Sequence, residues 1–298
     1  MSGPITSIEL PRPPDASQGR RYLIVFGVVG LWMVIGIAGQ LHTFAYLLVG
    51  IPLLLLFQVG IARRPITELW FKDPSRQPLP WWAYPILAAL IASDLPGLIH
   101  EWPISGWVRR GIGLAGLAGT VPLAYSIARF SRTALKPLLL GFATAGVIPF
   151  VILAAQRMAP PNAFSTGLQA AVASPSWLTG WNSFLGALLM FFVVEEVFFR
   201  GGLDSFVQRP HDRGQWRSAA FVSALWGAWH LPIKIPLLLA GSHPASHLVV
   251  AANIVGWPLA ACVVGIPLSL CWRRSGLLLV PALVHAFINA VPHVWSAP

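Results

Sequence analysis

The stretch that decides the fold reads Met190-Phe-Phe-Val-Val-Glu195-Glu196-Val-Phe-Phe-Arg200. It places two adjacent carboxylates and an arginine inside an apolar run that begins near Trp181. An ionisable group within a membrane segment is energetically costly, so such groups are usually paired, face the protein interior and mark function. On a helix, residues four apart are neighbours, so Glu196 can pair with Arg200 while Glu195 points elsewhere. The sequence therefore predicts a separate partner for Glu195.

Composition places the whole chain in the membrane class. It is 56% hydrophobic and 10% charged, with a mean hydropathy of +0.68, whereas soluble domains carry about 25% charged residues. A helix that crosses the hydrocarbon core needs roughly 20 apolar residues. The runs that approach this length are 22–39, 41–62, 82–100, 111–128, 136–155, 183–207, 217–234, 248–271 and 276–295. The sequence predicts an all-α, polytopic transmembrane helical bundle of eight to nine helices.

Charge and composition along the chain give the expected domains and topology. Residues 1–21 are polar and proline-rich and are expected to form a disordered cytoplasmic tail, followed by a single integral membrane domain over 22–298. The basic residues form short clusters between apolar runs and most of them, Arg273 included, fall on the expected cytoplasmic side. This is the positive-inside pattern, so the excess of basic residues indicates topology and not nucleic-acid binding. Because lysine is rare among them, we expect a bacterial plasma-membrane protein with a cytoplasmic N-terminus.

Three polar residues on different predicted helices are expected at similar depths in the membrane. Three basic residues mark the expected cytoplasmic ends of the late helices: Arg209, Arg217 and Arg274. Measured from these ends at 1.5 Å per residue, Glu195, His230 and His285 lie at depths of about 21, 20 and 17 Å. Asn289 is four residues after His285 and shares its helix face. The sequence therefore predicts one polar layer built from three helices.

Such a layer suits amide hydrolysis. A carboxylate assisted by an imidazole can take a proton from water. A second imidazole and an asparagine amide can donate hydrogen bonds to the oxyanion that forms at the attacked carbonyl, and these bonds are strong in a low-dielectric cavity. We therefore expect a water-filled catalytic cavity within the C-terminal helices, reached mainly from the cytoplasmic side.

Three motifs carry a family resemblance. E-E-V-F-F-R at 195–200, S-A-L-W-G-A-W-H-L at 223–231 and H-A-F-I-N at 285–289 resemble the motifs of the CPBP family. That family groups CAAX prenyl endopeptidases of the Ras-converting type with bacteriocin-processing and immunity (Abi-like) proteins. The resemblance covers roughly residues 180–292. It implies an intramembrane endopeptidase in which Glu195 is the general base, His230 its partner on the water, and His285 with Asn289 the oxyanion site.

The resemblance also covers supporting residues. Glu196 and Arg200 match the supporting pair of the family. The second motif usually has Phe four residues before its histidine, and this chain has Trp226 there, a change expected to affect substrate shape more than catalysis. Asp94, which no motif includes, is a further candidate for a substrate or proton contact.

Other mechanisms and functions stay open at this point. Glu195, His230 and His285 could be three ligands of a catalytic zinc, but H-E-x-x-H is missing and Glu195 would have to serve as ligand and base together. We expect a mechanism without metal. A non-catalytic scaffold or immunity protein could share the fold, and a proton-coupled transporter also buries charges at mid-membrane, although transporters usually show paired inverted halves.

The expected partners are the lipid bilayer and a membrane-associated protein or peptide, cut near its membrane-embedded or lipidated end. No nucleic-acid partner is expected.

Overall fold

The computed structural model describes residues 17–72 except 42, 123–151, 192–208, 216–240 and 247–295, with isolated positions between 81 and 188. Within these ranges the regular elements are helices. The described residues also contain one isolated β-bridge, between Phe71 and Leu277. The α-helices are α1 (Gln18–Ala38), α2 (Thr43–Leu55), α5 (Arg132–Thr144), α9 (Ser205–Val207), α10 (Trp216–Trp229), α11 (Leu231–Ala240), α12 (His247–Ser275) and α13 (Leu279–Trp295). The others are π-helices η1 (Leu56–Ile61) and η3 (Phe192–Asp204) and the 3₁₀-helix η2 (Ile66–Leu69). The predicted all-α class is confirmed for the part of the chain described.

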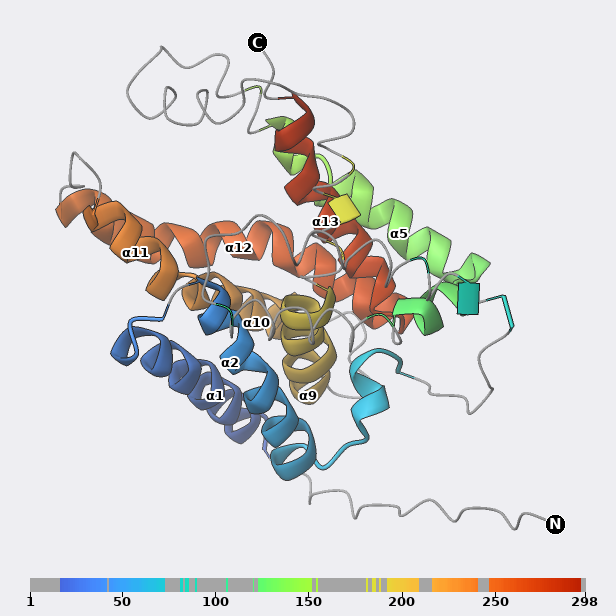
Figure 1. Cartoon of the computed structure of the whole chain (residues 1–298), viewed down its shortest axis with the longest axis horizontal. Helices are drawn as coiled ribbons and strands as arrows, with labels where there is room; N and C mark the ends of the chain where they lie inside the picture. Colours follow the sequence, from blue (N-terminus) through green and yellow to red (C-terminus); the bar gives the residue numbers. More distant parts are fainter. Residues whose placement is uncertain are drawn as a thin grey trace.

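The helices are arranged around α12 and η3. In Figure 1, α12 crosses the molecule, with α10 along it, α5 and α13 together at one end, and α1 and α2 on the opposite side. The π-helix η3 contacts α2, α10, α12 and α13. It therefore lies where the N-terminal and C-terminal helices meet.

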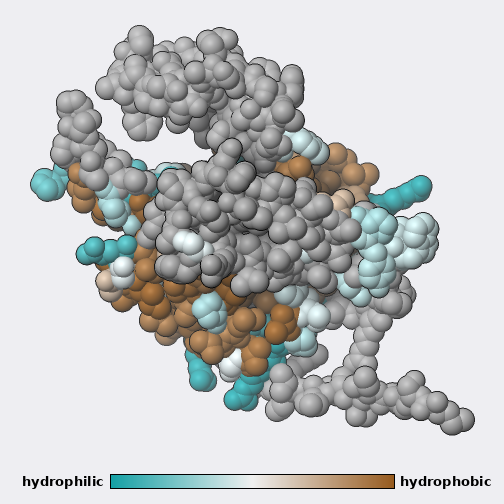
Figure 2. Space-filling view, in the orientation of Figure 1, coloured by the Kyte–Doolittle hydropathy of each residue, from teal (hydrophilic) through white to brown (hydrophobic). Residues whose placement is uncertain are grey.

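Several helices are apolar enough to cross a membrane. By length and composition these are Gln18–Ala38, Arg132–Val151 and Val250–Ser275, and Ala45–Ile61 and Leu279–Val291 are shorter apolar helices. Exposed apolar side chains follow α1 at Leu23, Phe26, Leu31, Val34 and Ile37. Figure 2 shows hydrophobic residues gathered over the lower part of the visible face, where Figure 1 places α1 and α2. The chain is an integral membrane protein, while the predicted eight or nine crossings stay a prediction because runs 82–100 and 111–128 lie mostly outside the described residues.

The predicted element boundaries need two corrections. The run 217–234 is not one helix, because α10 ends at Trp229, α11 begins at Leu231 and His230 lies in the turn between them. Pro232, which has no N–H to donate, sits in the first turn of α11, where no such bond is needed. At the other end, α1 begins at Gln18, and the Ser17 hydroxyl accepts a bond from its first turn. Residues 18–21 are therefore helical and do not belong to the predicted tail.

The close contact of α10 with α12 depends on Gly227. A Cβ atom at this position would lie 2.6 Å from the Cα atom of Pro258 and 2.6 Å from the carbonyl oxygen of Trp257. Both are backbone atoms, which cannot rotate away. A residue without a side chain therefore lets the two helices approach to the distance that the site requires.

We expect Gly227→Ala to destabilise the protein by about 1–3 kcal/mol, because the added methyl group overpacks the α10–α12 contact. Gly256→Ala on α12 is the matched control, since nothing lies within 4 Å of the Cβ atom it would add. In an interior helical position with open space, this change removes backbone freedom from the unfolded chain and should be neutral or stabilising. Thermal unfolding of the detergent-solubilised variants measures both effects, and equal unfolding temperatures for the two would contradict the prediction.

Candidate active site

The charged residues of the opening stretch lie on η3, and their side chains are buried. The exposed fraction is 3% for Glu195 and 0% for Glu196, Arg200 and Asp204. We expected an ordinary α-helix here, but the hydrogen bonding is that of a π-helix, a rare form that is frequent at functional sites. Buried charges need partners, so the contacts of each one define the site.

Glu195 meets an indole. The Nε1–H group of Trp226 on α10 donates to Glu195 Oε2 over 2.8 Å. The other carboxylate oxygen, Oε1, accepts no hydrogen bond from the described part of the chain. Sequence reasoning expected Trp226 to affect substrate shape and missed this direct contact with the carboxylate. The only sequence signal for it was a Trp where the family motif usually has Phe.

Glu196 is held by two residues. Its Oε1 accepts a hydrogen bond from Nδ1 of His285 over 2.8 Å, and its Oε2 lies 3.6 Å from Nε of Arg200. The predicted Glu196–Arg200 pair is therefore present in the structure. The Arg200 guanidinium also lies over the Trp226 ring, 4.6 Å from its centroid. Its three nitrogens are buried and form no hydrogen bond within the described residues.

His230 is oriented by the backbone at the end of α10. Its Nδ1 lies 2.8 Å from the carbonyl oxygen of Trp226. Because a carbonyl oxygen only accepts, Nδ1 carries the proton, and Nε2 of the neutral ring has a free lone pair. The ring stacks on Trp257 at 6.0 Å and interacts electrostatically with Glu195. His230 therefore presents an acceptor nitrogen in the layer where Glu195 lies.

The remaining predicted site residues have different outcomes. Asn289 lies one turn after His285 on α13, is half-buried and makes no hydrogen bond to a described residue. The ring of His285 meets the edge of Trp226 at a centroid distance of 5.2 Å. Asp94 lies outside the described residues. The site thus consists of two groups of residues. Glu195 and His230 form one group, and Glu196, Arg200 and His285 form the other. Trp226 contacts both groups.

The residues of the zinc alternative all lie in the described part of the chain. Within the described residues, which include Glu195, His230 and His285, no group of three His, Cys, Asp or Glu side chains is placed to hold a metal ion. The Nδ1 atoms of both histidines are bonded to other partners, the Trp226 carbonyl and the Glu196 carboxylate.

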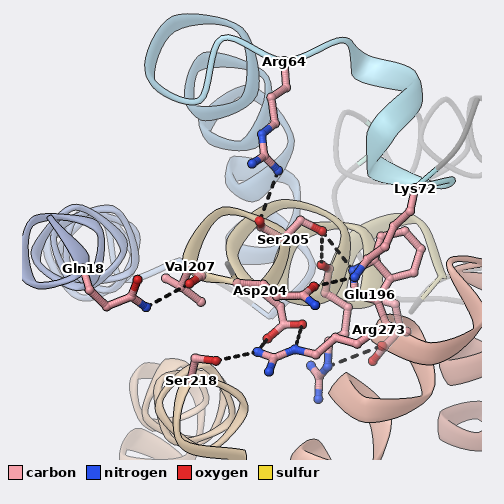
Figure 3. A network of polar contacts seen from close by, with 12 residues as sticks. Gln18, Arg64, Lys72, Glu196, Asp204, Ser205, Val207, Ser218 and Arg273 are labelled. Atoms are coloured by element: carbon pink, nitrogen blue, oxygen red, sulfur yellow. Dashed lines mark hydrogen bonds and ion pairs between the residues drawn. The ribbon is translucent and has the colours of Figure 1, made fainter. Parts of the chain in front are cut away.

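The end of η3 is fixed by a second buried ion pair, which Figure 3 shows. Arg273 of α12 donates to both oxygens of Asp204, over 2.9 and 2.5 Å, and to the Ser218 hydroxyl of α10 over 2.9 Å. Sequence reasoning counted Arg273 as a topology charge and did not single out Asp204. Further bonds to this end join Gln18 to the Val207 carbonyl, Arg21 to the Phe206 carbonyl, Arg64 to the Ser205 carbonyl, and Lys72 to Gln208. Four segments therefore bond to the end of the helix that carries Glu195: α12, α1 and the chain at Arg64 and at Lys72.

Comparison with known proteins agrees with the motifs. Residues 176–291 match the family described as type II CAAX prenyl endopeptidase Rce1-like. No curated protein and no solved structure matches the chain. The matched region contains η3, α10, α11, α12 and most of α13, and it includes the three motifs that resemble this family.

We expect Arg273→Met to cost about 3–5 kcal/mol of stability, because it leaves the Asp204 carboxylate buried without a counter-charge. The double variant Asp204→Leu with Arg273→Met should recover most of this loss, since it removes both buried charges. The neighbouring Arg274→Met is the control; Arg274 is exposed, and such a change usually stays within about 0.5 kcal/mol. Chemical unfolding in bicelles measures all three, and a double variant no more stable than Arg273→Met would contradict the account.

Proposed function

We propose that this protein is an intramembrane endopeptidase that cuts a peptide bond with a water molecule activated by Glu195. The observation that carries the proposal is the environment of this carboxylate. It is buried, one oxygen is held by an indole N–H, and the other has no hydrogen bond within the described residues. Membership of the matched region in an endopeptidase family supports the reaction class.

In the proposed first step, Glu195 takes a proton from water with the help of His230. The Oε1 atom of Glu195 and the Nε2 atom of His230 are the two acceptors available to orient that water. The hydroxide then attacks the carbonyl carbon of the scissile bond, and the proton held by Glu195 passes to the leaving amine. The bond to the nitrogen breaks, and a carboxylate and an amine are released.

The proposed oxyanion site consists of His285 and Asn289 on successive turns of α13. Nδ1 of His285 donates to Glu196, so only a ring protonated on both nitrogens has a second N–H for the oxyanion. Glu196 supplies the counter-charge for that form, and Arg200 in turn faces Glu196. Removing one oxyanion donor typically costs about 10²–10³ in kcat.

The proposed substrate is a membrane-associated protein or peptide, cut near its membrane-embedded or lipidated end. We place the active cavity within the C-terminal helices, open mainly to the cytoplasm, and the N-terminus of the chain on the cytoplasmic side of a bacterial plasma membrane. The supporting facts are the family match, the apolar helices and the distribution of basic residues.

Glu195→Gln should abolish cleavage, because an amide cannot accept the proton from water. The measurement compares cells that contain wild type or variant at equal protein levels and catalogues the peptide termini of the membrane proteome. Termini present with wild type and lost in the variant identify the substrate and the cleavage site together. His285→Ala, tested on that substrate, should lower kcat by about 10²–10³.

Glu68→Gln in η2 is the control, since Glu68 is a half-buried glutamate outside the site. It should leave the termini as in the wild type. If wild type and Glu195→Gln give identical termini and any cellular phenotype survives in the variant, the protein is a scaffold or immunity protein and not a protease. A pH-dependent transport activity altered by Glu195→Gln would instead indicate a transporter.

We further propose that catalysis needs no metal ion, because Glu195 serves as base and no three His, Cys, Asp or Glu side chains among the described residues are placed to hold one. Cleavage of the identified substrate by purified protein should then continue at an unchanged rate after dialysis against EDTA or phenanthroline. Loss of cleavage on chelation, followed by recovery with added zinc, would overturn this part of the mechanism and restore the zinc alternative.

A further inference from the structure

Trp226 contacts more of the proposed site than any other residue described. Its N–H binds Glu195, its ring lies under Arg200, its carbonyl accepts from His230 and its ring edge meets His285. We propose that Trp226 is a positioning residue that holds Glu195 in its working orientation and transmits the charge of Arg200 to it. This inference rests on the proposed function, because it assigns Trp226 a part in the same reaction.

The hydrogen bond explains how the base is oriented. A buried carboxylate without a partner pays the full desolvation penalty, so the 2.8 Å bond from Nε1 both stabilises the carboxylate and fixes its rotation. Only Oε2 is used by this bond, which leaves Oε1 for water. Phe, which the resembling motif usually has at this position, carries no N–H and could not make this bond.

The position of Arg200 explains how the supporting pair reaches Glu195. Arg200 donates no hydrogen bond to Glu195, and its cation lies 4.6 Å from the centroid of the Trp226 ring. A cation over an aromatic face is attracted to the ring electrons, most strongly where water is excluded. It draws electron density from the indole and makes the N–H group a better donor to the anion. Glu196 fixes Arg200 from the other side at 3.6 Å.

The backbone of the same residue orients the second proton acceptor. The Trp226 carbonyl holds Nδ1 of His230 as a donor, so Nε2 is the nitrogen left for water. One residue therefore sets both the rotation of Glu195 and the tautomer of His230. Only the first of these depends on the side chain, which allows the two effects to be separated by experiment.

The test replaces Trp226 by β-(3-benzothienyl)alanine, which has nearly the shape of Trp but carries sulfur in place of N–H. Trp229 is the matched control. It lies on the same helix, is 1% exposed, and its Nε1 has no hydrogen-bond partner within the described residues. The same replacement there removes an N–H group that has no hydrogen-bond partner among the described residues. The full-length variants are assayed in nanodiscs on the substrate identified by its new termini.

We expect the replacement at 226 to lower kcat by about 10- to 100-fold with KM unchanged, the loss of one hydrogen bond to a charged group. The replacement at 229 should change neither constant. Equal kcat for wild type and the 226 variant would overturn the proposal, and so would a change in KM alone, which would indicate a role in substrate binding.

A second readout needs no substrate. The indole ¹H–¹⁵N signal of Trp226, assigned by its loss in Trp226→Phe, should move upfield in Glu195→Gln because a neutral amide is a weaker acceptor than a carboxylate. The Trp229 signal should stay in place. An unmoved Trp226 signal overturns the inference. If the Trp226 signal shifts but the protein cleaves no substrate, the proposed function is refuted, while the hydrogen bond by which Trp226 orients Glu195 is still supported.

Discussion

The structure depends on the neutralisation of buried charge on one helix. Along η3 lie three acidic side chains and one arginine, all nearly or completely buried. Arg200 can face only one of the acids, so the other contacts must come from outside the helix. Asp204 is paired by Arg273 of α12, Glu196 also takes a bond from His285 of α13, and Glu195 takes one from α10. Because an unpaired charge in this environment costs several kcal/mol, these contacts require α10, α12 and α13 to pack around η3.

Aromatic packing also holds η3. Phe198 and Phe199 follow the two glutamates and are completely or almost completely buried against Trp32 of α1 and Trp229 of α10. The tyrosine of α2 joins this group, since the Tyr46 hydroxyl donates to the Trp229 carbonyl over 3.0 Å. The N-terminal helices, which lie outside the family match, therefore also pack against η3. Packing from several helices keeps the carboxylates of η3 in a defined orientation.

The sequence predicted those features that depend on local spacing. The all-helical class followed from the apolar runs, and the Glu196–Arg200 pair followed from a separation of four residues. Contacts between helices were beyond it, because they depend on the rotation of each helix about its axis. This is why Trp226 was not predicted to meet Glu195, and why Arg273 was taken for a topology charge although it is buried against Asp204. The depth estimate for His230 assumed one continuous helix, whereas α10 ends just before it.

The adjacent glutamates show how contacts can give two identical side chains different tasks. Both oxygens of Glu196 face protein groups: Oε1 accepts a hydrogen bond from Nδ1 of His285, and Oε2 lies 3.6 Å from Nε of Arg200, without a hydrogen bond among the described residues. Glu195 uses one oxygen for an N–H dipole and keeps the other free of described hydrogen bonds. Consecutive residues of a helix point in different directions, so exchanging the two partners would require a rotation of the whole helix. That rotation would also separate Asp204 from Arg273. The buried pair at the end of η3 thus helps to fix which of the two glutamates faces Trp226.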